Sequence, residues 1–130
     1  MAYVTTAINP SPTIVAKAAS ELVAPSMLAV KYNDAGMFEI AGAGSAAIGI
    51  CVADMNAPAS AGQDVTVAIK DITLWRSGGA FVPGDELTPD ANGAAVKANA
   101  GDFILGFALQ QSFDAGEVVF AQITKSGYKA

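Results

Sequence analysis

The 130-residue sequence contains no histidine and only one cysteine, Cys51. Without histidine, no side chain has an ordinary pKa suited to a general base near neutral pH, and the commonest nitrogen ligand of transition metals is missing. Cys51 lies in the apolar run IGICVA, where we expect a buried small hydrophobe rather than a reactive thiol. We therefore predict that the protein is not an enzyme and holds no metal or cofactor.

Positive charge is also scarce. Seven Lys and Arg residues stand against twelve Asp and Glu residues, and the basic residues form no cluster. Because nucleic-acid binding depends on neutralising phosphates, we expect no nucleic-acid partner. The sequence also lacks the roughly 18-residue apolar run of a membrane helix and the basic and apolar blocks of a secretory signal. We therefore expect a soluble domain made in a reducing compartment, with no membrane partner.

The sequence is rich in glycine, proline and short apolar runs. These overrule the helix preference of its many alanines, and the apolar residues alternate, as do Val65, Val67 and Ile69. Short strands separated by turns at regular intervals are typical of an all-β sandwich or barrel. We predict a small antiparallel β-barrel or sandwich, with strands near residues 28–32, 37–41, 46–53, 64–69, 72–76, 80–82, 86–88, 94–98, 103–110 and 117–124.

One short helix is predicted at Ile14–Val23, where an amphipathic turn or two can form. Its apolar and polar positions are Ile14, Lys17, Ala18, Glu21 and Leu22.

Residues 1–13 are predicted to form an extended N-terminal arm, and residues 14–130 a single β domain. The arm holds β-branched and apolar side chains followed by prolines, which favour an extended chain with open main-chain groups that can add a strand to a partner's sheet. The candidate partner-binding or subunit-exchanging residues of this arm are Tyr3, Val4, Thr5, Thr6, Ile8 and Pro10. An ordinary frayed terminus is the alternative.

The stretch GDELTPDANGAAV (84–96) carries carboxylates beside a glycine, as catalytic and metal loops do. Pro89 supplies a fixed φ, Asp90 and Asn92 can bond their own backbone, and Gly93 accepts positive φ. Acids at alternate positions and a terminal bidentate Glu, which a calcium loop requires, are missing. The stretch is therefore interpreted as a strand–turn–strand connection.

A repeat of this pattern suggests that one motif is used twice, although chains rich in Ala and Gly also produce self-similarity by chance. The proposed equivalences are Leu28 with Leu87, residues 33–36 with 90–93, 46–53 with 103–110, and 61–69 with 115–123.

Trp75 and Arg76, which precede Ser77-Gly78-Gly79, are the second candidate for a binding surface. Trp and Arg are enriched at interface anchors. A half-buried edge residue is the alternative for Trp75.

Over residues 20–125 the chain resembles the capsid decoration, or head cement, proteins of tailed bacteriophages. The likeness is carried by AIGICVADM, AGQDVTVAI and the C-terminal half from GGAFVPGDEL onward. Family patterns match at Gly84, Asp85, Leu87, Asp90, Gly93, then at Leu105-Gly106-Phe107-Ala108-Leu109, and then at Ala115, Gly116, Glu117 and Val119. Two departures concern the register: Thr88-Pro89 stands where relatives often carry an aromatic, and Ala121 replaces an aliphatic residue.

The resemblance implies a non-enzymatic structural protein of the virion with a compact β-barrel-like, β-tulip-like domain. Such proteins commonly form trimers on the outer surface of the mature capsid and clamp neighbouring major capsid protein subunits. Two alternatives come from other classes. A lipoyl- or biotinyl-type carrier needs an exposed modified lysine at a hairpin tip, whereas Lys97 is expected on a strand flank. A small β-sandwich ligand-binding module needs converging polar side chains, which the sequence does not display.

Overall fold

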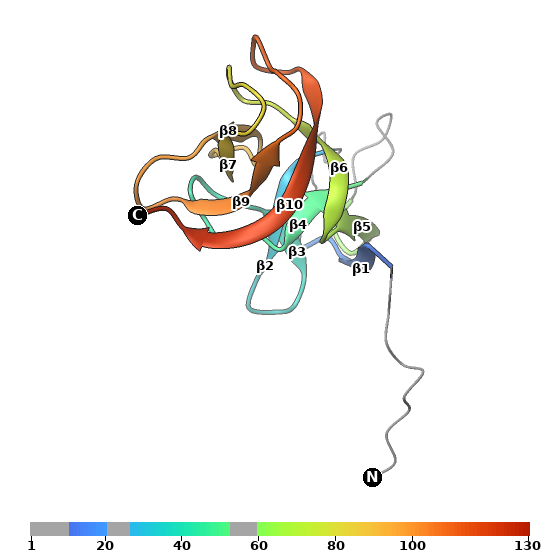
Figure 1. Ribbon diagram of the computed structural model, residues 1–130. Helices are drawn as coiled ribbons and strands as arrows, with labels where there is room; N and C mark the ends of the chain where they lie inside the picture. The colour runs from blue at the N-terminus through green and yellow to red at the C-terminus, as the bar shows by residue number, and fades with distance from the viewer. Residues whose placement is uncertain (1–10, 21–26, 53–59) are drawn as a thin grey trace, which may run out of the picture.

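The computed structural model describes residues 11–20, 27–52 and 60–130. Within these ranges the chain forms ten β-strands and no helix, so the all-β prediction is confirmed (Figure 1). No helix in the described residues is long and apolar enough to cross a membrane. The strands are β1 (Thr13–Lys17), β2 (Ala29–Tyr32), β3 (Phe38–Ile40), β4 (Gly49–Cys51), β5 (Asp64–Ala68), β6 (Asp71–Arg76), β7 (Glu86–Pro89), β8 (Ala95–Lys97), β9 (Phe103–Ala108) and β10 (Val118–Tyr128).

The strands form two five-stranded antiparallel sheets, arranged as a sandwich rather than as closed barrels. The first sheet has the order β1-β5-β4-β2-β3 and the second the order β6-β10-β9-β7-β8. Each sheet curls until the residue after its first strand touches its last strand through one isolated bridge, Ala18 with Phe38 and Ser77 with Ala95. β10 is the longest strand, and Figure 1 shows it curving across the second sheet.

The helix predicted at Ile14–Val23 is wrong where the structure describes it. Residues 13–17 form β1, which pairs along its whole length with β5. Three consecutive β-branched residues, Thr13, Ile14 and Val15, favour an extended chain. Pairing with β5 also satisfies main-chain groups that would stay unpaired at the ends of a short helix. Tertiary pairing thus outweighs a weak amphipathic pattern. Residues 21–23 lie outside the described part of the chain.

Two apolar clusters stabilise the fold. The larger lies between the sheets and combines small residues of the first sheet, such as Ala29 and Ala68, with large residues of the second, such as Trp75 and Leu87. The smaller lies inside the curl of the first sheet and includes Cys51. Small residues facing large ones let the side chains of the two sheets interdigitate.

The strand orders confirm that one motif is used twice. Each strand of the first sheet has the position of a strand in the second, so that β1, β5, β4, β2 and β3 correspond to β6, β10, β9, β7 and β8. The β2–β3 and β7–β8 turns are also equivalent. Asn33 accepts the N–H groups of Ala35 and Met37, while Asp90 accepts those of Asn92 and Ala94. Gly36 and Gly93 take the positive φ that each turn requires, 77° and 80°.

A glycine in β4 and a glycine in β9 correct one predicted equivalence. Val30 pairs with Gly49 as Leu87 pairs with Gly106. Val30, and not Leu28, therefore corresponds to Leu87. The turns on one side and the glycines on the other fix this register. Matching Leu28 to Leu87 gives the wrong register because that match relies on residue identity alone.

The corners before β5 and β10 repeat with one chemical difference. In the first, the amide oxygen of Gln63 accepts the N–H of Ser60 at 2.8 Å. In the second, the carboxylate of Glu117 accepts the N–H of Asp114 and of Phe113, and these bonds, aided by Ser112, lower the pKa of Glu117 below its ordinary value. In the second repeat a carboxylate thus accepts the corner N–H groups, whereas in the first repeat an amide oxygen does so.

Replacing Gly106 with alanine should destabilise the protein by about 1–3 kcal/mol, because overpacked strands must separate. A Cβ at Gly106 would lie 2.1 Å from the carbonyl oxygen of Gln122, and one at Gly49 would lie 2.1 Å from that of Ala68. Urea unfolding followed by Trp75 fluorescence measures the loss. Gly79→Ala is the control, since a Cβ there meets nothing within 4 Å. Equal stability of the G106A and G79A variants would contradict the close strand approach.

The stability of the protein should depend on Glu117 at acidic pH. Because its pKa is lower in the folded state, its contribution is complete above its ordinary value of 4.5 and is lost as pH falls through the lower folded value. Glu117→Gln keeps an acceptor but cannot titrate, so its free energy of unfolding should fall less steeply below pH 4.5. Gln63→Glu is the reciprocal variant and should gain pH dependence. Parallel pH profiles for wild type and E117Q would refute this role.

Candidate functional site

The predicted arm residues lie outside the part of the chain that the structure describes. The binding role of the arm therefore stays a prediction for all six residues, Tyr3, Val4, Thr5, Thr6, Ile8 and Pro10. The described chain enters the domain at β1, an edge strand of the first sheet. The carbonyl of Pro12 already accepts the N–H of Ile69 at 2.8 Å, and β1 begins at Thr13, the last residue of the predicted arm. An arm that precedes β1 would thus start at a sheet edge.

Trp75 does not lie on the surface. Its side chain is fully buried in the larger apolar cluster, and its indole N–H donates to the carbonyl of Gly93 at 2.9 Å. The prediction of an interface anchor at Trp75 is therefore corrected: an aromatic ring with both its apolar body and its polar N–H satisfied inside one chain stabilises the core.

Arg76, the neighbouring candidate, is half-buried at the end of β6. Its guanidinium donates to the carbonyl of Gly116 at 3.2 Å, and its main-chain N–H donates to the carbonyl of Met27 at 2.8 Å. The side chain thus lies across the corner before β10, and its role as a contact stays a prediction.

An apolar surface lies on the outer face of the second sheet. Leu74 of β6 and Phe120 of β10 are cross-strand neighbours, and Ile72 lies two residues earlier on β6. All three are exposed, Ile72 at 59%. Sequence reasoning missed this surface. The alternation in DITLWR contained the signal, because assigning Trp75 to the core places Ile72 and Leu74 on the opposite face.

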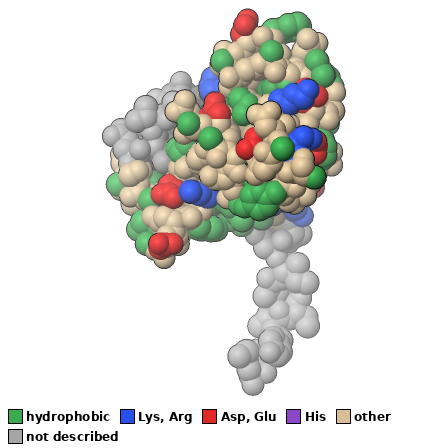
Figure 2. All heavy atoms as spheres, turned by 90° about the vertical axis from the view of Figure 1, so that its left-hand side faces the viewer, with side chains coloured by type: hydrophobic (Ala, Val, Ile, Leu, Met, Phe, Trp, Pro, Cys, Tyr) green, Lys and Arg blue, Asp and Glu red, His purple; other side chains and the backbone are tan. Residues whose placement is uncertain are grey.

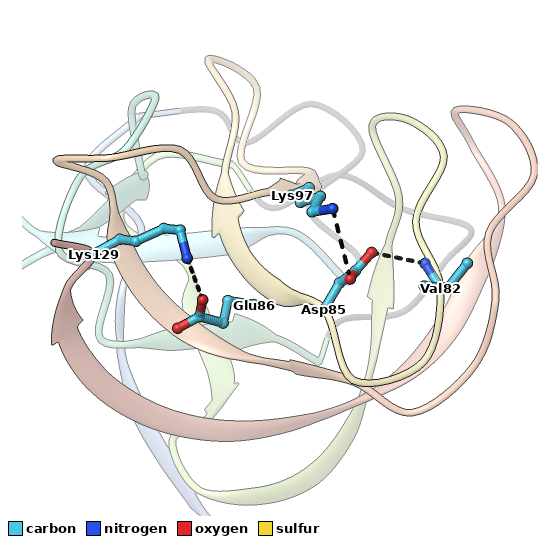
Figure 3. A network of polar contacts seen from close by, with 5 residues as sticks. All are labelled: Val82, Asp85, Glu86, Lys97 and Lys129. Carbon is cyan, nitrogen blue, oxygen red and sulfur yellow. Dashed lines mark hydrogen bonds and ion pairs between the residues drawn. The ribbon is translucent and has the colours of Figure 1, made fainter.

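A shallow hollow of about 350 Å³ opens beside the loop before β7. Phe81, Val82 and Phe113 form its apolar wall, and Asp85 and Lys97 its polar side. Figure 3 shows the Asp85 carboxylate between Lys97, whose Nζ is 3.9 Å away, and the N–H of Val82, which donates at 3.0 Å. Both of the charged groups are thus paired. Lys97 ends β8 on a strand flank, as the sequence predicts.

Four lysines of the described surface form ion pairs with carboxylates. Lys129 binds Glu86 on the other side of β7 (Figure 3), and Lys17 binds Asp64 across β1 and β5. On the face seen in Figure 2, Lys and Arg side chains lie beside carboxylates rather than in a patch of their own. Such exposed pairs contribute little stability, about 0–1 kcal/mol each, and they leave the apolar side chains as the distinctive feature of the surface.

The described residues offer little for catalysis. Burial raises the pKa of the Cys51 thiol to about 11, so the thiolate that a nucleophile requires is scarce. Burial also lowers the pKa of Lys125. Within the described ranges, no three His, Cys, Asp or Glu side chains gather closely enough to hold a metal ion.

Comparison with known proteins agrees with this description. The family model for phage cement protein matches residues 8–123. Among solved structures, the N base of head fiber gp8.5 of bacteriophage phi29 is similar, with a TM-score of 0.66 and 21% sequence identity over 91% of this chain and 98% of that chain. At this identity the likeness shows a shared fold. No curated protein matches the chain. Because the family match extends over most of the sequence, the chain belongs to the phage cement protein family.

Proposed function

We propose that this protein binds the outer surface of the bacteriophage capsid as a homotrimer and stabilises the lattice by clamping neighbouring major capsid protein subunits. The family match over residues 8–123 is the observation that carries the proposal. The described surface supports it, because exposed apolar side chains and open sheet edges suit binding to another protein. In this proposal the protein is a non-enzymatic virion component without a cofactor, made in the host cytoplasm.

Contact with the capsid is assigned to residues 1–13. Main-chain hydrogen bonds of an added strand supply affinity, and Tyr3, Val4 and Ile8 supply apolar contacts. Arg76 is the candidate contact on the β domain. Stabilisation of the shell follows from mass action: a protein that binds only the assembled lattice adds RT ln(1 + [L]/Kd) per site, about 2.7 kcal/mol at a hundredfold excess over Kd. Many sites acting together would then raise the temperature at which the shell opens.

Deleting residues 1–10 should separate folding from binding. β1 and the bond from Ile69 to Pro12 are retained, so the free energy of unfolding should change by no more than about 0.5 kcal/mol. Capsid affinity should fall by more than about tenfold, since several net hydrogen bonds of about 1 kcal/mol each are lost together. Cosedimentation with shells measures binding, and calorimetry measures the opening temperature.

A full-length variant with Tyr3, Val4 and Ile8 all changed to serine is the matched control. It retains the main-chain hydrogen bonds and loses the apolar contacts, so its affinity should lie between those of the wild type and the deletion. If the deletion variant binds and protects shells as well as the wild type does, the arm is not the contact, and the β domain must provide it.

Cys51→Ala should leave capsid binding unchanged. The thiol is buried beside Val30, Phe38 and Val67, so the expected effect is a packing loss of about 1 kcal/mol. A thiol reagent should label the folded wild type slowly and the urea-unfolded chain at once. Rapid labelling of the folded protein with loss of binding would instead reveal a functional thiol.

A further inference from the structure

The two repeats, one for each sheet, meet where the β7–β8 turn of the second rests on the first. The carbonyl of Gly93 accepts the N–H of Ala29 at 2.7 Å, and the carbonyl of Pro89 accepts that of Gly44 at 2.9 Å. Pro89 and Gly93 are both buried. The first sheet receives the turn with small buried residues, such as Ala29 and Ala41. The contact between the repeats is therefore a turn end placed on a sheet face with small side chains.

The same end of the first repeat lacks such a cover. The counterparts of Pro89, Gly93 and Ala94, all of them buried, are Tyr32, Gly36 and Met37. Tyr32 is 44% exposed, Gly36 is exposed and Met37 is half-buried. A Cβ at Gly36 would meet nothing within 4 Å, and Figure 1 shows the β2–β3 turn projecting at the bottom of the domain, clear of β7 and β8. We call Tyr32, residues 33–36 and Met37 the free turn end.

The free turn end keeps an open main-chain acceptor. In the second repeat, the carbonyl of Gly93 accepts two N–H groups, one from Ala29 and one from the indole of Trp75. The counterpart of Trp75 is Ala16, since each lies two residues before the bridge that closes its sheet, and alanine has no side-chain donor. Among the described residues, no main-chain group donates to the carbonyl of Gly36. That carbonyl is therefore available to the N–H of a partner.

The side chains of the free turn end are of types that anchor interfaces. Tyr and Met are enriched where proteins meet. The ring of Tyr32 packs against buried Phe38 with the ring centroids 4.8 Å apart, so it loses little conformational entropy when a partner covers it. Lys31 and Glu39, on the two strands that flank the turn, form an ion pair at 3.9 Å. The strands beside the turn thus add no net charge to this surface.

We propose that the free turn end is a further contact with the shell, and that it binds a sheet face of the major capsid protein that carries small side chains and an open main-chain N–H. The contact inside the chain supplies this chemistry, because Ala29 lets the turn approach closely and its N–H donates to the turn glycine. A face of Ala, Gly or Ser beside an unpaired N–H would reproduce both features. The inference rests on the proposed capsid-binding function and names a surface of the β domain that serves it.

A second copy of this chain fits the free turn end poorly. The face that corresponds to the receiving face lies on the second sheet, where Glu86 stands in place of Ala29. Glu86 is paired with Lys129, and the carbonyl of Lys129 accepts the N–H of Gly101, the counterpart of Gly44. The C-terminal residues of the chain thus cover the place at which the turn of another copy would bind.

Truncating the free turn end tests the contact. Tyr32→Ser combined with Met37→Ser should weaken binding to shells of the major capsid protein by about tenfold or more, because two anchor side chains are lost. Val82→Ser combined with Phe113→Ser is the matched control. These side chains are exposed, at 50% and 67%, but belong to the second repeat, so shell affinity should not change.

A variant at the tip of the turn keeps the test valid if loss of the Tyr32–Phe38 contact unfolds the protein. Ala35 is exposed, so Ala35→Arg adds bulk to the free turn end without removing a packed side chain. Urea unfolding followed by Trp75 fluorescence should show wild-type stability, while shell affinity falls by about tenfold or more.

Photo-cross-linking identifies the partner. In a Cys51→Ala background, Ala35→Cys labelled with a benzophenone maleimide should cross-link to the major capsid protein on saturated shells. The cross-linked capsid peptide, identified by mass spectrometry, should lie on a strand with small side chains. Ala80→Cys, at an exposed position of the second repeat, is the control and should give much less capsid product. A cross-link from Ala35→Cys to a capsid helix or to another copy of this chain would overturn the proposal.

Shell binding by the wild type separates this inference from the proposed function. If the wild type binds shells and the folded variants at Tyr32, Met37 and Ala35 bind equally well, the free turn end is not a contact, and the capsid-binding function stands. If the wild type does not bind, both proposals fail. Native mass is measured on the same variants, and loss of an oligomer would show that the turn end contacts another copy, which also contradicts the inference.

Discussion

The carbonyl oxygen of Gly93 joins the two halves of this protein. It accepts the main-chain N–H of Ala29 at 2.7 Å and the indole N–H of Trp75 at 2.9 Å. Ala29 belongs to the first sheet, whereas Trp75 and the turn that contains Gly93 belong to the second. A side chain at Gly93 would place its Cβ 2.8 Å from the carbonyl of Ala29. The close approach of the sheets, and the burial of Trp75 with its N–H satisfied, therefore both depend on a residue without a Cβ.

The duplication explains much of the remaining structure. Both repeats use an Asx turn after β2 or β7, a glycine in β4 or β9 that pairs with β2 or β7, and a side-chain acceptor at the corner before β5 or β10. They differ where the halves meet: the second repeat supplies Trp75 and the first supplies small alanines, so that the packing between the sheets is asymmetric although the topology is not. At the corner, the carboxylate of Glu117 takes the place of the Gln63 amide, and its corner hydrogen bonds lower its pKa.

These features suit a structural component of the phage head. The two-sheet domain pairs four of its lysines with carboxylates and exposes apolar side chains, among them Ile72, Leu74 and Phe120 on the second sheet. In the proposed function, affinity for a repeating shell would come from many modest contacts acting together, which requires no single pocket. Exposed apolar side chains on the second sheet, such as Ile72, Leu74 and Phe120, would suit such contacts.

The sequence determined the secondary structure class, the turn at residues 90–93 and the duplication, because glycine, proline and alternating apolar residues act locally. It also determined the burial of Cys51, which lies in a continuous apolar run. The tertiary structure decided the rest. Residues 13–17 form a strand because β5 offers a partner. Val30, rather than Leu28, is the counterpart of Leu87. Trp75 lies in the core, while Ile72 and Leu74 face outward. Each of these outcomes depends on which segments meet across the fold, and a local pattern contains no information on the distant strand against which it will pack.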